Sequence, residues 1–214
     1  MDRTTARIWT IMWKVALVLL TLQVAAVSAL RYFTGSEAAP EFILGNAWAN
    51  PFLVIHVAAG VVALLIGPLQ FVRRIRAQFP AFHRAIGRTY VGACAIGAPS
   101  GFMLAIGTNA GPIASTGFAV AAVLWPIFTY FGVRAAIEGK FATHREWMIR
   151  SYAITANAIT LRLMLPLAGV MGFDFFAAYG VIAWLGWITN LVLVEIHLRR
   201  TRGSVMIERR LATA

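Results

Sequence analysis

The sequence predicts an all-α fold, a polytopic membrane helix bundle of about six transmembrane helices with a four-helix core. Of the 214 residues, 60% are hydrophobic and only 13% are charged. One soluble core of this size cannot hide that much apolar surface, whereas a bilayer solvates it. The apolar residues also fall in long runs, with charged residues gathered between them. No linker-like segment divides the chain, so we expect a single transmembrane domain over residues 1–214, ending in a basic cytoplasmic tail at 199–214.

Six stretches are long enough to cross a bilayer, which takes about 20 mostly apolar residues. The first stretch has features of a cleavable signal peptide, because Arg3 and Arg7 precede it and Val27-Ser28-Ala29 resembles a cleavage site. Its apolar run is longer than the roughly 7–15 residues of a signal peptide, so we expect an uncleaved helix. Cleavage would leave the other five spans with the same orientation. The predicted spans are residues 8–30, 51–72, 85–106, 113–133, 147–170 and 175–198.

Basic residues predict the orientation of these spans. The net charge is +11, and 17 of the 19 basic residues are arginines. They form short clusters at alternate ends of the apolar runs, a pattern typical of cytoplasmic loops and not of a nucleic-acid-binding surface. We therefore expect the inner (cytoplasmic) membrane, cytoplasmic N- and C-termini, no nucleic acid, and anionic lipid headgroups as partners of the arginine clusters. No protein partner can be named from the sequence.

An internal repeat relates the second and third predicted helices to the fourth and fifth. The same residue types recur at an offset of 61 positions, which suggests two copies of one helical hairpin in parallel orientation. Arg88-Thr89-Tyr90 also matches Arg150-Ser151-Tyr152 after a slip of one residue. The pairs that share the offset are Pro51 and Pro112, Val72 and Val133, Arg73 and Arg134, His83 and His144, and Arg84 and Arg145.

The repeated His-Arg pairs form the first candidate site. Pro80 can open the third helix, and Thr143 with Glu146 predicts a capping box for the fifth, which would put His83 and His144 in first turns at the cytoplasmic surface. Two histidines at the same depth could ligate the iron of haem b, the candidate cofactor, while nearby arginines neutralise propionates or a quinone or phosphate headgroup. The alternative is that these residues only anchor helices at the interface. The arginines concerned are Arg84, Arg88, Arg145 and Arg150.

Polar residues inside the spans form a second candidate site. His56 and Arg162 are predicted at a similar depth toward the external side, and an intramembrane arginine indicates function by default. They could hold a cofactor or, with Thr160, a substrate or proton. Alternatively, Arg162 could extend outward to Asp174 or Glu41. The other polar residues in the spans could line a path through the bundle, and interhelical hydrogen bonding explains them equally well. They are Gln70, Thr155, Asn157 and Asn190.

Other sequence patterns give weaker indications of function or concern helix packing. A metal at the cytoplasmic rim could use His83, His144 and His197 near Glu195, but their spacing matches no known zinc signature. Acidic residues are nearly absent from the spans, which argues against a cation-coupled transporter, and no enzymatic class can be assigned. A stripe of Ala93, Gly97 and Gly101 should let another helix approach closely. Prolines inside four spans should kink them, and these are Pro68, Pro99, Pro126 and Pro166.

Several short motifs, taken together, resemble a known family. They are His56 with Gly60, Gly67-Pro68-Leu69-Gln70-Phe71, His83-Arg84-x-x-Gly87-Arg88-x-Tyr90, His144-Arg145-x-Trp147-Met148-x-Arg150-Ser151-Tyr152, and Thr160-Leu161-Arg162. The series resembles the bacterial multi-pass membrane family catalogued as domain of unknown function 2306, over about residues 51–165. The resemblance implies a membrane bundle and no particular activity. The family positions it singles out are His56, Gln70, His83, Arg84, Gly87, Arg88, His144, Arg145, Arg150 and Arg162.

Two classes of function follow from these patterns. The leading hypothesis is an electron-transfer membrane protein that binds b-type haem or a quinone. The alternative is a transporter or a lipid- or anion-binding protein without a redox cofactor, or an accessory membrane subunit. A looser likeness to four-helix cytochromes b does not extend to a two-haem arrangement, because only His56 is predicted on the external side.

Overall fold

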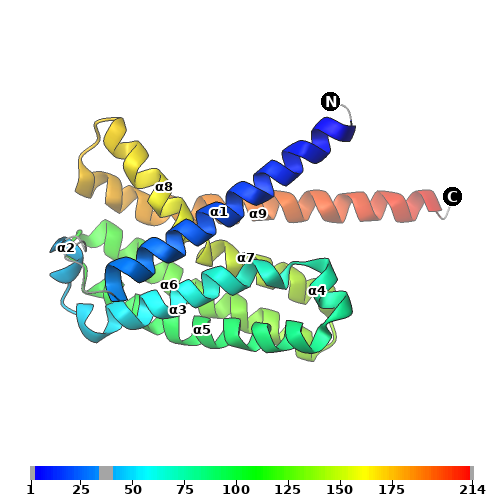
Figure 1. Cartoon of the computed structure of the whole chain (residues 1–214), viewed down its shortest axis with the longest axis horizontal. Coiled ribbons are helices and arrows are strands. Elements are labelled where there is room, and N and C mark those ends of the chain that lie inside the picture. The colour runs from blue at the N-terminus through cyan, green and yellow to red at the C-terminus, as the bar shows by residue number, and fades with distance from the viewer. Residues whose placement is uncertain (1–2, 34–40, 213–214) are drawn as a thin grey trace. The chain divides into compact units, whose positions relative to one another are not determined.

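The computed structural model describes residues 3–33 and 41–212, and each regular element in these ranges is an α-helix. The chain divides into two compact units, which we call unit 1 (Met1–Asn109) and unit 2 (Ala110–Ala214) and describe separately. Unit 1 contains α1 (Arg3–Phe33), α2 (Glu41–Leu44), α3 (Ala49–Gln70), α4 (Arg73–Gln78) and α5 (Pro80–Ile106) (Figure 1). Unit 2 contains α6 (Pro112–Ile137), α7 (Phe141–Thr155), α8 (Asn157–Val170) and α9 (Phe175–Ala212).

In unit 1, α3 and α5 form a hairpin, and α1 packs against α3. Small residues such as Ala63, Ala93 and Ala98 are buried, which lets the helices approach closely. Leu64 and Tyr90 are the larger side chains of this packed interior. Figure 1 shows α4 at one end of the hairpin and α2 at the other, so the polar connections are confined to the ends of the apolar helices.

In unit 2, α6 and α7 form the hairpin, and α9 packs against α6, α7 and α8. Gly117 on α6 is buried, and a Cβ there would lie 2.9 Å from the indole of Trp184 on α9. The indole of Trp184 donates a hydrogen bond of 3.0 Å to the Ile113 carbonyl. These contacts of Trp184 set the position of α9 along the start of α6.

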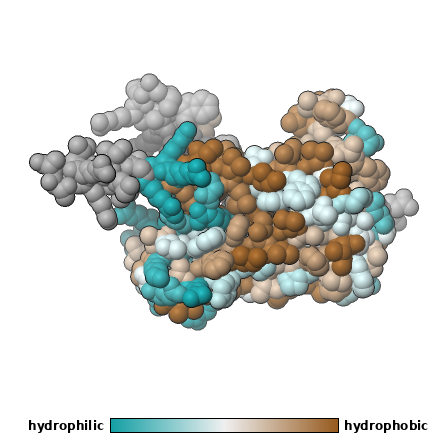
Figure 2. Space-filling view, turned by 180° about the vertical axis from the view of Figure 1, so that it is seen from behind, coloured by the Kyte–Doolittle hydropathy of each residue, from teal (hydrophilic) through white to brown (hydrophobic). Residues whose placement is uncertain are grey.

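Five helices of the described chain are long and apolar enough to cross a membrane. Only 28% of the apolar window of α3 is buried, so most of its surface faces outward. Figure 2 shows the resulting hydrophobic surface along the helices, with hydrophilic residues toward their ends. The first predicted stretch, 8–30, lies within α1, where Val18–Arg31 forms a shorter apolar helix. The candidate spans are Ala49–Gln70, Pro80–Ile106, Pro112–Ile137, Phe141–Val170 and Phe175–Arg202.

The predicted repeat agrees with the positions of the helices. α5 begins at Pro80 and α7 at Phe141, which are 61 positions apart. His83 and His144 are each the fourth residue of their helix, and their backbone N–H groups donate to the carbonyls of Phe79 and Lys140, each at 2.9 Å. The prediction that both histidines lie in first turns is therefore confirmed. The two copies differ in their connections, because α4 joins α3 to α5 whereas α6 itself continues to Ile137.

One expectation about the fifth span was wrong. The capping box is absent, because α7 begins at Phe141, before Thr143, and its start carries no side-chain cap. The fifth span predicted over 147–170 is confirmed within the candidate span Phe141–Val170, although Ala156 separates α7 from α8 inside it. The break exposes carbonyls at the end of α7, and Asn190 on α9 donates to that of Ala153 at 3.0 Å.

Candidate functional site

His56 in unit 1 lies against the small-residue stripe of α5. Its Nδ1 is 2.8 Å from the carbonyl oxygen of Gly97. The ring lies so close to Gly101 that a Cβ there would be 2.7 Å from His56 Cε1. The predicted close approach at this stripe is confirmed, and α3 is the helix that makes it.

The Gly97 carbonyl determines which nitrogen of His56 carries a proton. A carbonyl oxygen only accepts hydrogen bonds, so Nδ1 donates and the lone pair of the neutral ring is on Nε2. Ser100 donates to the same carbonyl at 3.1 Å, which further polarises the acceptor.

His144 in unit 2 has the same arrangement. Its Nδ1 is 2.8 Å from the carbonyl oxygen of Gly132 on α6. Gly132 is buried, and a Cβ there would lie 2.5 Å from the sulfur of Met148, so a larger residue would have to displace the Met148 side chain. The geometry again leaves the lone pair on Nε2.

The remaining predicted residues of unit 1 gather where α3 ends and α5 begins. Gln70 is 8% exposed and its amide lies against Gly87, where a Cβ would be 3.3 Å from Gln70 Oε1. Arg84 and Arg88 flank Gly87 and are exposed, while His83 is half-buried. The structure therefore brings these predicted positions together at one end of the hairpin.

In unit 2, the corresponding end contains an ion-pair network. The Arg150 guanidinium donates to both carboxylate oxygens of Glu195, from Nε at 2.5 Å and from Nη2 at 3.1 Å. It also lies 4.8 Å above the ring of Trp147. Glu146 lies 4.0 Å from Arg150 and is bound by both Nε and Nη2 of Arg202. Arg150 is thus already neutralised by its own chain, and a role on a cofactor stays a prediction.

A second set of charges lies at the turn between α6 and α7. Glu138 accepts hydrogen bonds from Lys140 at 2.8 Å and from Arg134 at 2.9 Å. These two cations, Lys140 first, hold the pKa of the Glu138 carboxyl below its ordinary value. Arg145 is exposed.

Arg162 lies on α8, half-buried within an apolar helix. Its Nη1 donates to the Ala158 carbonyl of the same helix at 2.9 Å. Nearby, Thr160 donates to Asn190 Oδ1 at 2.9 Å, while Asn190 itself donates to Ala153. Interhelical hydrogen bonding, one of the two explanations for the polar residues in the spans, therefore applies to Asn190, with Thr160 as one of its partners.

The sequence between residues 53 and 198 matches the family described as predicted membrane protein (DUF2306). The chain belongs to this family. The match confirms the predicted resemblance and extends it into α9. No curated protein and no solved structure matches the chain.

As a member of the DUF2306 family, the chain is an integral, multi-pass membrane protein. All predicted site residues lie within the matched range, whereas the basic tail lies beyond it. Predictions that join a residue of unit 1 to one of unit 2, such as His83 with His144 or His56 with Arg162, stay predictions. Within the described ranges, no group of three or more His, Cys, Asp or Glu could hold a metal ion.

Three contributors to these sites were missed from the sequence. Glu195 was considered only as a metal neighbour, although it binds Arg150. Gly97 was assigned to helix packing and Gly132 was not considered, although their carbonyls orient His56 and His144. A small residue facing a histidine was the only available signal, because backbone acceptors leave no mark in the sequence.

Proposed function

We propose that the protein is an electron-transfer membrane protein that binds b-type haem or a quinone. The observation that carries the proposal is the 2.8 Å pairing of His144 Nδ1 with the Gly132 carbonyl. Metal-ligating histidines generally donate their other ring nitrogen to a carbonyl or carboxylate, which fixes the ring and leaves Nε2 able to bind. Nε2 in this form fits haem iron and can also accept a proton from a quinol hydroxyl.

The first turn of α5 supports the same proposal. His83 occupies the position in α5 that His144 occupies in α7, and each is followed by an exposed arginine, Arg84 or Arg145. Exposed guanidinium groups beside the ligand suit the propionates of haem. A bound haem would supply a one-electron couple, and the chain would supply the ligands and their orientation.

A reduced-minus-oxidised absorption spectrum of the purified protein, expressed with haem supplied, tests the haem form. We expect a Soret band with sharp α and β bands, lost in His144→Ala and in His83→Ala. His197→Ala is the matched control, because His197 is exposed on α9 and should be dispensable. A colourless wild-type protein, or a spectrum unchanged in His144→Ala, overturns it. Quinone in a solvent extract of the same protein, lost in His144→Ala, would then support the quinone form.

Arg162 favours a second candidate function, the binding or transport of an anionic or amphiphilic ligand without a redox cofactor. The Arg162 guanidinium lies half-buried in an apolar helix. A charge inside a membrane is costly, so an arginine there indicates a binding site for an anionic group. A colourless protein whose thermal stability rises with a long-chain carboxylate, but not in Arg162→Gln, would support this function. An equal rise in Arg162→Gln would contradict it.

A further inference from the structure

An exposed cluster of cations lies at the end of unit 1 formed by residues 72–90, which we call the arginine-rich end. The sequence contains no Asp or Glu between Glu41 and Glu138, so α3, α4 and α5, the described helices that form this end, supply no carboxylate here. In the described part of the chain, Arg74 donates a hydrogen bond of 2.9 Å to the neutral side-chain amide of Gln78. The exposed arginines are Arg73, Arg74, Arg76, Arg84 and Arg88.

The corresponding end of unit 2 is neutralised by its own carboxylates. Arg88 matches Arg150 in the repeat, and Arg150 is bound bidentately by Glu195. At the hairpin turn of unit 2, Glu138 binds Arg134 and Lys140. The same hairpin therefore has carboxylate counter-ions in unit 2, whereas the described helices α3, α4 and α5 of unit 1 contain none.

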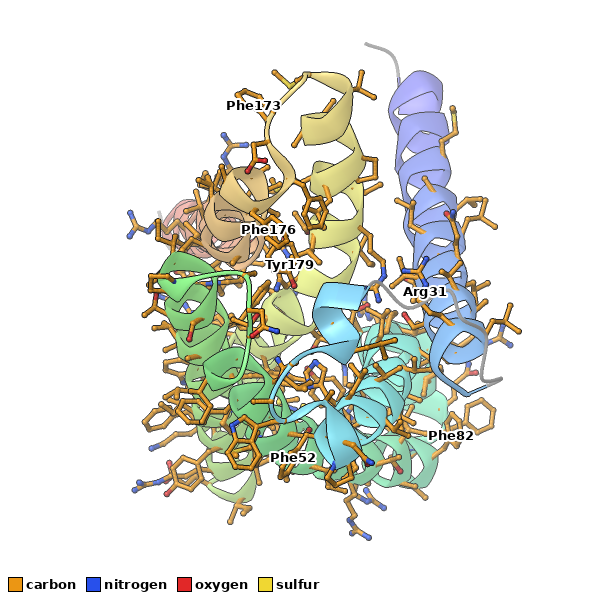
Figure 3. All side chains as sticks on the ribbon, turned by 90° about the vertical axis from the view of Figure 1, so that its left-hand side faces the viewer. Arg31, Phe52, Phe82, Phe173, Phe176 and Tyr179 are labelled. Carbon is orange, nitrogen blue, oxygen red and sulfur yellow. The ribbon has the colours of Figure 1, made fainter. Side chains whose placement is uncertain are left out.

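Exposed apolar side chains lie beside the uncompensated arginines. Val72, Phe79 and Phe82 are 41%, 58% and 50% exposed. Figure 3 shows the ring of Phe82 projecting away from the hairpin. The arginine-rich end lies where two apolar spans terminate, the depth at which aromatic rings and headgroups meet in a bilayer. A small aqueous anion would match only the arginines, whereas an amphiphile matches both sets.

A buried donor adjoins the same cluster. Gln70 is 8% exposed, and its Nε2 has no hydrogen-bond partner in the described part of the chain. Its amide lies against Gly87, between Arg84 and Arg88 in the first turns of α5. Leaving such a donor unpaired is costly, so an oxygen brought from outside the unit would stabilise this end.

We propose that the arginine-rich end of unit 1 binds the headgroup of an anionic phospholipid. Arg84 and Arg88 hold the phosphate through charge-assisted hydrogen bonds, and the arginines of α4 add to the positive potential. Phe79 and Phe82 contact the part of the acyl chains next to the headgroup. This inference requires no redox cofactor, but it gives Arg84 a lipid phosphate as its partner where the haem proposal gives it a propionate.

Native mass spectrometry of the full chain in a neutral detergent tests the inference. The probes are phosphatidylglycerol, zwitterionic phosphatidylcholine and inorganic phosphate. We expect wild-type protein to prefer phosphatidylglycerol, and Arg84→Gln/Arg88→Gln to bind it roughly tenfold more weakly. Arg134→Gln/Lys140→Gln is the matched control, because it also removes two positive charges but from a turn with its own carboxylate. Its affinity should stay within about twofold of wild type.

Three outcomes would overturn the inference. Equal weakening in both double variants would mean general charge attraction, and equal binding of both lipids would mean no headgroup selection. Displacement of phosphatidylglycerol by millimolar inorganic phosphate would identify a free anion as the ligand. The single variants Arg84→Gln and Arg88→Gln provide the comparison if the double variant does not fold. Phe82→Ser should weaken phosphatidylglycerol binding without changing the response to phosphate.

Discussion

Glu195 on α9 binds Arg150 on α7 by accepting two hydrogen bonds, one from Nε and one from Nη2 of the guanidinium group. Only 14% of the Arg150 side chain is exposed, whereas Glu195 is 40% exposed. The pair therefore joins the terminal helix of unit 2 to its hairpin in a setting that is only partly shielded from solvent.

Replacing Glu195 with Gln should destabilise unit 2. The change keeps the side-chain shape but removes the charge, which leaves the largely buried Arg150 cation with Glu146 at 4.0 Å as its nearest carboxylate. We expect a loss of about 1–2 kcal/mol, measured by tryptophan fluorescence during thermal unfolding. Glu138→Gln is the control, because its ion pairs are exposed, and should have a smaller effect. Equal effects would show that the Arg150 pair contributes no more than a surface pair.

Gly101→Ala should destabilise unit 1. The added Cβ would lie 2.7 Å from His56 Cε1 and 2.8 Å from Nδ1, so either the ring or α3 must shift. We expect a loss of about 1–3 kcal/mol. Cys94 is the only cysteine and is buried, so its reaction with a maleimide during heating reports the unfolding of α5. Gly92→Ala is the control on the same helix, since a Cβ there meets nothing within 4 Å. If Gly92→Ala matches Gly101→Ala, the cost comes from the helix backbone and not from His56.

Asn190→Leu should destabilise the junction of α7 and α8. The change removes the donor to the Ala153 carbonyl and the acceptor for Thr160. Interhelical hydrogen bonds in membranes contribute about 0.6 kcal/mol each on average, so we expect a loss near 1 kcal/mol. Thr160→Val removes only one of the two bonds and should cost less. In a double-mutant cycle of thermal unfolding, the double variant should cost less than the sum of the two. Strict additivity would contradict the bond between them.

Glu138 should titrate below the ordinary range of a glutamate. Because its pKa is lowered in the folded state, its ion pairs stabilise the turn above the unfolded-state pKa and lose that effect as pH falls through the folded-state pKa. The carbon chemical shift of its carboxyl, followed by NMR, gives the pKa. Lys140→Gln should raise this pKa more than Arg134→Gln does, because Lys140 contributes most to the lowering. The reverse order would identify Arg134 as the main partner.

The sequence predicted the apolar spans well because membrane crossing depends on length and hydrophobicity, which are local properties. The start of α5 at Pro80 followed from the preference of proline for first helical positions. The start of α7 was predicted less accurately, because Glu146 forms an ion pair with Arg202 instead of a cap. That choice depends on a residue 56 positions away on another helix.

The break at Ala156 shows the same limit. Four prolines marked expected kinks, yet α7 ends at a position without one, where Asn190 supplies a donor to the Ala153 carbonyl. The pairing of Arg150 with Glu195 likewise depends on how α9 is rotated against α7. The rotation of a helix about its axis is set by packing over the whole unit. Short sequence patterns could therefore identify Arg150 and Asn190 as candidate residues, but not the groups that they bind.

The proton position on His56 depends on a main-chain oxygen, and every residue type carries one. Substitution at position 97 cannot delete this acceptor, whereas added bulk at Gly101 would push the ring away. The protonated nitrogen of His56 therefore stays the same when neighbouring residues are replaced, as long as the replacements are small. A histidine oriented by an aspartate would lose its orientation through a single substitution.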